Sequence, residues 1–246
     1  MKMKLGIFSN LSIVLLFTIS SCSIDDQNLK ENKTHCGFGF SISEMKEIGV
    51  NHNIWLMQVI NKIDYSSLNL SDELASKMNL IPNNLTQDQK NHVVQMYQAC
   101  FSSNNNLSAK ITNSNTLLLY NEIINQLELS LNIEDLNSRL DNLSVIVLNN
   151  TACLDKEALI IGIEVCRNSA LLWFPRQMGG MELIKNIGSR FDWRKHVRND
   201  IAGATFGVFE LGGAIAFGAV PGTNAIIGGY IASAAIGGSC MGALFP

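Results

Sequence analysis

Strong charge of either sign is missing from this sequence. Only 16% of its 246 residues are charged, the formal net charge is −3, and the isoelectric point is near 5.8. Proteins that bind nucleic acids usually present a strongly basic surface, which neutralises phosphates. The composition therefore argues against a nucleic-acid binder and predicts no nucleic-acid partner.

Motifs that carry catalysis or hold metals are missing as well. The chain has no G-x-S-x-G, no H-E-x-x-H and no glycine-rich phosphate-binding loop. No C-x-x-C pair or Cys/His cluster has the spacing of a zinc site. We therefore predict a protein that is not an enzyme and that uses no metal or cofactor.

Sheet-like alternation is also missing, and helical periodicity takes its place. Apolar residues recur at steps of three and four in five segments: 41–63, 86–101, 115–129, 133–143 and 155–174. Ser41 and Glu44 have the spacing of a capping box at the start of the first segment. The last segment has few strongly polar residues before Pro175, so it is expected to be a central helix. The pattern predicts an all-α helical bundle, in which 144–150 fits either a short strand or a helix end.

The N-terminus has the order of a secretory signal. Lys2 and Lys4 precede an apolar run at 11–19 that is too short to span a membrane. The segment ISSC, which ends at Cys22, resembles a bacterial lipobox, in which the cysteine becomes lipidated. Cleavage of an ordinary signal peptide nearby is the alternative. The acidic stretch at 23–27 resembles the tether that sends some lipoproteins to the cell surface.

These features divide the chain into four parts. We expect a lipoprotein signal peptide at 1–21, a lipid-anchored tether at 22–40, a helical domain at 41–200 and a glycine-rich hydrophobic hairpin at 201–246. An acylated Cys22 would anchor the mature chain, because each buried methylene adds about 0.8 kcal/mol. The predicted location is the outer membrane of a bacterial cell envelope. If the acidic tether is an export signal, the protein is exposed on the cell surface.

Cysteines are few and odd in number after the lipobox. They are Cys36, Cys100, Cys153, Cys166 and Cys240. An exported protein can form disulfides, and an odd count leaves at least one thiol free or paired between chains. The favoured interpretation is that these cysteines are small apolar residues of the core.

A short motif in the first helical segment suggests a family. The stretch GVNHNIWLMQVI contains Gly49, His52 and Asn53, and a later helix carries Ser169 four residues before Trp173. Together with the lipobox and a glycine-rich C-terminal segment, this resembles the uncharacterised Bacteroidetes-type lipoproteins. The resemblance implies a lipoprotein with a helical body and a glycine-zipper-like tail, and it implies no particular activity.

His52 is the one histidine on an apolar helix face, between Ile48 and Trp55. It could act as a general base, or it could organise the core by hydrogen bonding. The chain offers no recognisable nucleophile or carboxylate pair beside it, so we favour a polar core site formed by His52 and Asn53.

The segment before the hairpin mixes cations with aromatic rings. We propose a membrane-interface collar formed by Arg190, Trp193, Arg194, Lys195 and Arg198. The alternative is a solvated amphipathic helix whose aromatic rings face the bundle. The next 20 residues contain Glu210 alone as a charge, a turn follows at 221–224, and 225–245 is uncharged.

Small residues in this hairpin recur four apart, which lets two helices approach closely. The predicted helix-packing positions are Gly203, Gly207, Gly218, Gly222, Gly229, Ser233 and Gly237. In composition and spacing they resemble the glycine-zipper helices of two-component pore-forming bacteriocins. In water such glycines cost a helix up to about 1 kcal/mol each relative to alanine, so the hairpin requires lipid or a tight protein partner.

Three functions follow from these patterns. The first is a non-enzymatic envelope lipoprotein whose tail packs in the core or pairs subunits as a homo- or hetero-oligomer. The alternative is a membrane-active surface toxin, bacteriocin-like or pore-forming, whose hairpin inserts into a membrane. A hydrolase that uses His52 is the least favoured.

Overall fold

The computed structural model describes residues 37–60, 62, 76, 111–182, 192–216, 227–229 and 231–236. All of them belong to one compact unit, 35–246. Several predictions lie outside the described residues: the signal peptide, Cys22, most of the tether, the helix at 86–101, and Arg190, Gly218, Gly222 and Gly237.

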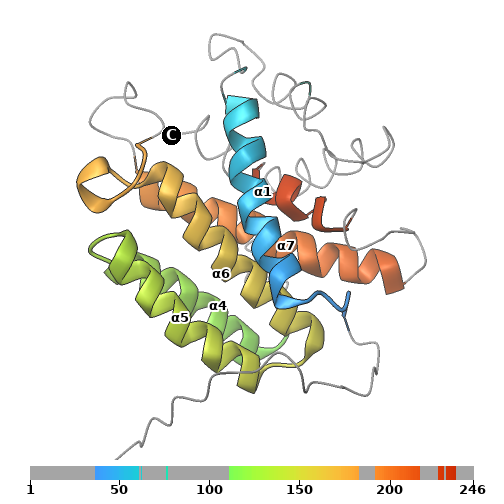
Figure 1. The fold of residues 1–246 in the computed structure, drawn as a ribbon. Helices are drawn as coiled ribbons and strands as arrows, with labels where there is room; N and C mark the ends of the chain where they lie inside the picture. Colours follow the sequence, from blue (N-terminus) through green and yellow to red (C-terminus); the bar gives the residue numbers. More distant parts are fainter. Residues whose placement is uncertain are drawn as a thin grey trace, which may run out of the picture. The chain divides into compact units, whose positions relative to one another are not determined.

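The described residues form α-helices, one short 3-10 helix and no strand, which confirms the predicted all-α fold (Figure 1). The elements are α1 (Ile42–Ile60), α4 (Ser114–Leu129), α5 (Ile133–Asn150), α6 (Cys153–Trp173), η2 (Arg176–Met178) and α7 (Trp193–Ala216). Residues 227–229 and 231–236 are also helical. The segment 144–150 is the end of α5, so its helical interpretation is correct.

Side chains fix the starts of three helices. At α1, the Ser41 N–H and hydroxyl both donate to Glu44 Oε2, while the Glu44 N–H donates to Ser41 Oγ at 3.2 Å. This is the capping box that the sequence predicts. Asn113 accepts from two backbone N–H groups of α4, and Asn132 accepts from the N–H of Asp135 in α5. Each cap satisfies donors that a helix start leaves without a partner.

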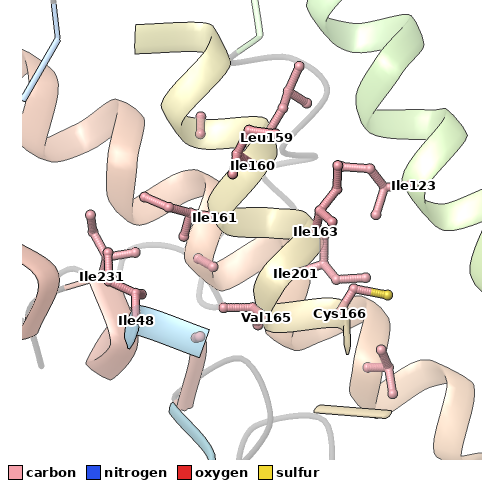
Figure 2. Close-up of a cluster of buried hydrophobic side chains, with 14 of the residues drawn as sticks. Ile48, Ile123, Leu159, Ile160, Ile161, Ile163, Val165, Cys166, Ile201 and Ile231 are labelled. Atoms are coloured by element: carbon pink, nitrogen blue, oxygen red, sulfur yellow. The ribbon is translucent and has the colours of Figure 1, made fainter. Parts of the chain in front are cut away.

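Helix α6 is the centre of the bundle, as its pattern predicts. Fourteen of its residues are buried, and α7, α1, α5 and α4 all pack against it. Figure 2 shows the apolar part of this core around α6. The residues it labels are Ile48, Ile123, Leu159, Ile160, Ile161, Ile163, Val165, Cys166, Ile201 and Ile231. The core therefore forms between helices that are far apart in the sequence.

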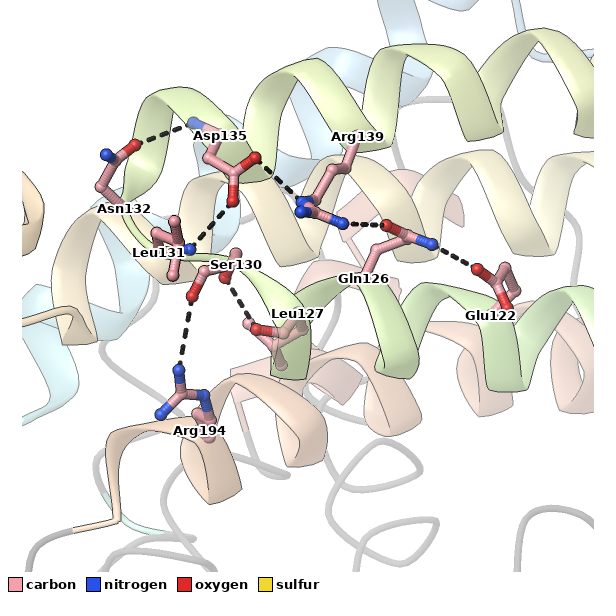
Figure 3. Close-up of polar contacts among 9 residues, drawn as sticks. All are labelled: Glu122, Gln126, Leu127, Ser130, Leu131, Asn132, Asp135, Arg139 and Arg194. Carbon is pink, nitrogen blue, oxygen red and sulfur yellow. Dashed lines mark hydrogen bonds and ion pairs between the residues drawn. The ribbon is translucent and has the colours of Figure 1, made fainter.

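Helices α4 and α5 form a hairpin with a polar turn (Figure 3). Ser130 closes α4 by donating its hydroxyl to the Leu127 carbonyl at 2.7 Å. Asp135 accepts the Leu131 N–H at 2.9 Å and pairs with Arg139 at the same distance, one turn further along α5. We call the polar side chains drawn in Figure 3 the α4–α5 turn network, which comprises those of Glu122, Gln126, Ser130, Asn132, Asp135, Arg139 and Arg194.

Helix α7 joins two parts of the chain that the sequence divides. The boundary expected between 200 and 201 lies inside it, because α7 runs unbroken from Trp193 to Ala216. The helical segment 231–236 lies against α7 and runs antiparallel to it, since Ile231 is next to Gly207 whereas Ala235 is next to Gly203. No described helix is long and apolar enough to cross a membrane.

A buried polar cluster as the candidate functional site

Asp200 of α7 lies in the core and gathers polar side chains from two other helices. The Ser169 hydroxyl of α6 donates to Asp200 Oδ2 at 2.5 Å, and Trp173 Nε1 donates to the same oxygen at 3.2 Å. His52 Nε2 of α1 lies 3.5 Å from that oxygen, and both side chains are fully buried. We call His52, Asn53, Ser169, Trp173 and Asp200 the Asp200 cluster.

The orientation of the His52 ring follows from its other neighbour. Asn53 Nδ2 donates to the Asn168 carbonyl at 2.6 Å, which directs the amide oxygen of Asn53 toward His52 Nδ1 at 3.0 Å. Because that oxygen only accepts, Nδ1 carries a proton. The other ring nitrogen, Nε2, faces Asp200 Oδ2 across 3.5 Å. Asn53 therefore fixes the direction in which the His52 ring faces Asp200.

A glycine brings α1 close enough to α6 for these bonds. A Cβ at Gly49 would lie 2.7 Å from the Glu164 carbonyl oxygen and 2.8 Å from Asn168 Nδ2. Real side chains do not tolerate such a distance from backbone, so only glycine fits this crossing. Gly49 thus allows the close approach of α1 on which the contacts of His52 and Asn53 depend. Ser169 and Trp173 of α6 bind the Asp200 carboxylate that His52 faces.

The carboxyl group of Glu164 lies near this crossing, and nearby cations only partly compensate for its burial. Glu164 of α6 is buried, and burial raises the pKa of its carboxyl, although Arg167 and Lys46 partly oppose this rise. Arg167 also reaches across to α5, where its guanidinium contacts Asp141 Oδ1 at 2.9 Å. The α1–α6 contact therefore includes a buried carboxyl group, on the residue whose carbonyl lies against Gly49.

The arrangement of the Asp200 cluster differs from that of a catalytic serine. An activated serine donates its proton to a base, which a third group orients. Here Ser169 donates to the carboxylate itself, and Asp200 lies between Ser169 and His52. Asp200 Oδ1 and His52 Nε2 have no hydrogen-bond partner within the part of the chain described. The geometry is that of a cross-link between α1, α6 and α7.

A second buried histidine, His196 of α7, lies one turn before Asp200. His196 is buried and stacks on Trp173, with ring centroids 4.7 Å apart. The same tryptophan thus contacts α7 through its ring face and through its N–H, which fixes how α7 lies on α6.

The proposed membrane-interface collar makes contacts within the protein. Trp193 packs on Phe174 with ring centroids 4.0 Å apart, and Arg194 lies 4.1 Å above the Trp193 ring. Arg194 and Arg198 each lie 3.5 Å from a carboxylate oxygen of Glu128 on α4. Lys195, Arg194 and Arg198 are all of intermediate exposure. These contacts attach the start of α7 to the bundle.

Two of the predicted helix-packing glycines, Gly203 and Gly207, lie at close helix contacts. A Cβ at Gly203 would lie 2.4 Å from the Ala234 carbonyl oxygen, and one at Gly207 would lie 2.9 Å from Ala234 Cβ. Gly229 and Ser233 are buried. The small residues therefore allow α7 and the segment 231–236 to pack against each other.

The structure corrects the interpretation that all the cysteines are apolar core residues. Cys166 is free and fully buried, and burial raises the pKa of its thiol, as expected for a core residue. Cys153, in contrast, is disulfide-bonded, so it is not simply an apolar core residue. Cys153 lies in the first turn of α6 and is partly exposed.

Sequence reasoning identified His52 and Asn53 as a polar core pair but missed Asp200. Periodicity placed His52 on the buried face of α1, and the family resemblance singled out Ser169 and Trp173. Asp200 stands at the end of a basic stretch and was given no role of its own. Its signal was its position four residues after His196, on the side of α7 that continues as glycine and alanine.

The fold and the cluster define an all-α protein whose central helices are cross-linked by a buried Asp–His pair. Comparison with models of known families, with curated proteins and with solved structures finds no match. In the described residues no group of three or more His, Cys, Asp or Glu side chains is arranged to hold a metal ion.

Proposed function

We propose that this chain is a non-enzymatic lipoprotein of the bacterial cell envelope, anchored through Cys22, whose glycine-rich tail packs in the core of its own helical body. The observation that carries the second part is the burial of the tail. Ile201, Ala204, Ile231 and Ala235 are fully buried, and Gly203 contacts the Ala234 backbone.

The contacts of the tail favour core packing over insertion into a membrane. A glycine inside a helix weakens that helix by up to about 1 kcal/mol relative to alanine. This cost is offset where the glycine allows another backbone to approach closely. Gly203 and Gly207 have such a neighbour within the same chain. The collar cations support the same view, since Glu128 already pairs with Arg194 and Arg198.

The Asp200 cluster supports a structural role. Its side chains come from three helices and are directed at one carboxylate oxygen. A buried charge or acid that lost one of these partners would be strongly destabilising, so the cluster favours a single packing of α1, α6 and α7. His52 therefore contributes to this protein as a core residue.

One experiment distinguishes core packing from membrane insertion. Amide exchange of 231–236 is measured in the mature protein without its lipid, first in buffer and then with liposomes that contain a trapped dye. We expect the same slow exchange in both conditions and no dye release. If 231–236 exchanges fast in buffer, the tail is not packed in the core. If the liposomes release dye and the exchange of 231–236 changes in their presence, the chain is instead the membrane-active surface toxin.

The lipid anchor is tested separately. Cells that express the full chain are fed a labelled fatty acid, and the same is done with Cys22→Ser. We expect label in the native chain and none in the variant. Label that persists in Cys22→Ser, or its absence from both chains, would exclude the anchor and leave the tail experiment unaffected.

A further inference from the structure

The chain just before α1 is bound to the start of α6 by a buried carboxylate. Glu157 Oε2 accepts the Phe38 N–H at 2.8 Å, and Glu157 Oε1 accepts the N–H groups of Gly39 and Phe40 at 2.7 Å and 3.0 Å. Gly39 has φ +74°, a left-handed conformation that lets successive N–H groups converge on one anion. Figure 1 shows this segment and the start of α6 at the same end of the bundle.

Cys153 lies one helical turn before Glu157 and is disulfide-bonded. Side chains of an α-helix lean toward its N-terminus, so the Glu157 carboxylate lies over the turn that contains Cys153. Gly37 is in the same place, because a Cβ built on it would lie 2.8 Å from Glu157 Oε2. The residue bonded to Gly37 is Cys36. Consecutive Cα atoms are about 3.8 Å apart, and disulfides join Cα atoms roughly 4.4–6.8 Å apart.

We infer that Cys36 is the disulfide partner of Cys153. The bond and the Glu157 contacts together form an N-terminal clasp, defined by Cys36, Phe38, Gly39, Cys153 and Glu157. The clasp holds the incoming chain to the first turns of α6.

Two other cysteines fit the described contacts less well. Cys166 is a buried free thiol. The segment 231–236 runs along α7 from Gly207 toward Gly203, which is the direction of Asp200 and of Ser169 on α6. Cys240 therefore follows a segment that leads away from Cys153, toward the opposite end of α6.

Cys100 is the competitor that the test must separate. It precedes Ile111 by eleven residues, and the start of α4 also lies near α6, since Thr116 Oγ1 donates to Asp155 Oδ2 at 2.8 Å. Cys36, in contrast, is one residue from a described contact with the same turn of α6. The shorter connection favours Cys36.

The Cys36–Cys153 bond forms by thiol–disulfide exchange with a catalyst. The thiols of Cys36 and Cys153 give up two protons and two electrons as their sulfurs join, and an oxidised protein dithiol catalyst takes these up to become two thiols. The product closes a loop that includes α1, α4 and α5, which restricts the unfolded chain. If the lipid anchor of the proposed function is correct, the clasp also moves the expected end of the tether from residue 40 to Cys36.

The pairing is tested on the full exported chain by peptide mapping without reduction, after alkylation of free thiols in denaturant. We expect one linked pair of peptides that contains Cys36 and Cys153, and alkylated Cys166. In Cys36→Ser, Cys153 becomes alkylated, whereas the control Cys166→Ser keeps the linked pair. A link from Cys153 to Cys100 or Cys240, a free Cys153, or a disulfide at Cys153 that survives Cys36→Ser would overturn the inference. Lipidation affects none of these outcomes.

The carboxylate half of the clasp has its own measurement. Glu157→Gln replaces one acceptor oxygen by an NH₂ group that faces a donor, so amide exchange at Phe38, Gly39 and Phe40 should become at least about tenfold faster. The Cys36–Cys153 link should remain in this variant. Unchanged exchange at all three amides would show that Glu157 does not hold the segment.

Discussion

The Asp200 cluster and the α4–α5 turn network both tie a carboxylate to donor side chains, but they lie in different surroundings. His52 and Asp200 are fully buried, whereas Asp135 and Arg139 have side-chain exposures of 28% and 34%. The cluster connects helices far apart in the sequence, and most bonds of the network join residues within one turn of each other. Water can replace a lost partner in the network and has no such access in the core.

The difference teaches that similar polar contacts have unequal consequences. Removing one side of a buried pair leaves a charge or a polar group without compensation, and this is strongly destabilising. Removing one side of an exposed pair restores hydration and costs little. The network therefore shapes a turn, whereas the cluster fixes how the three central helices cross.

The largest effect should come from Asp200→Ala. The variant leaves Ser169 and Trp173 without their shared acceptor and removes the carboxylate that faces His52, and we expect the free energy of unfolding to fall by about 3–5 kcal/mol. Denaturant titration followed by circular dichroism measures this change. A loss below about 1 kcal/mol would mean that the buried cluster behaves like the exposed network.

The next effect should come from Gly49→Ala, which tests the crossing of α1 and α6. In an open helix interior this change stabilises by up to about 1 kcal/mol. Here the new methyl group would overlap the Glu164 carbonyl, so we expect a loss of about 1–3 kcal/mol. The sign alone is decisive, because a more stable variant would show that the helices do not cross this closely.

A smaller effect is expected from Glu128→Gln beside the turn network. Glu128, Arg194 and Arg198 are about 30–40% exposed, and their N–O distances are 3.5 Å. Solvent screens such pairs, so the loss should be about 0.2–1 kcal/mol. Thermal unfolding in low and high salt checks this value, and the difference between variant and parent should shrink in high salt. A salt-independent loss of several kcal/mol would mean that these ion pairs behave like the buried Asp200 cluster.

The smallest effects should appear in pH dependence, where buried and exposed carboxylates have opposite signs. The Leu131 N–H lowers the pKa of Asp135, so its contribution is present above pH 3.8 and is lost as pH falls. Burial raises the pKa of Glu164, so its contribution is present below pH 4.5 and is lost as pH rises through the folded-state pKa.

Two variants separate these signs. Asp135→Asn should flatten the fall of stability on the acid side. Glu164→Gln should remove a loss of stability between acidic and neutral pH. Unfolding titrations from pH 2 to 7 compare each variant with the parent. Identical pH profiles for the two variants would contradict the assignment of opposite signs.

Much of the helical fold could be predicted from the sequence. The steps of three and four placed Met45, Ile48, His52, Trp55 and Val59 on one face of α1, and all five are buried. The capping box began α1 where expected, and Pro175 follows Phe174, the C-cap residue of α6. These features are local, since helix caps and periodicity depend on residues within a few positions of one another.

The partners of these faces could not be predicted in the same way. Asp200 directly follows the basic segment and had no predicted role, and only the fold shows that it accepts from Ser169 and Trp173. Periodicity identifies which side of a helix is buried without identifying the helix that covers it. The same reason explains why Glu157 was not recognised as the acceptor for Phe38 and Gly39.

The stretch at 226–245, uncharged and rich in glycine, shows the division most clearly. Its sequence determined that it must leave water and that its small residues permit close packing, because glycine is unfavourable in a free helix. Only the tertiary structure decided what fills that space for the described part of it: Gly203 and Gly207 of α7 lie against Ala234 and Ile231. Composition sets the need for a close neighbour, whereas the choice of neighbour depends on long-range packing around α6.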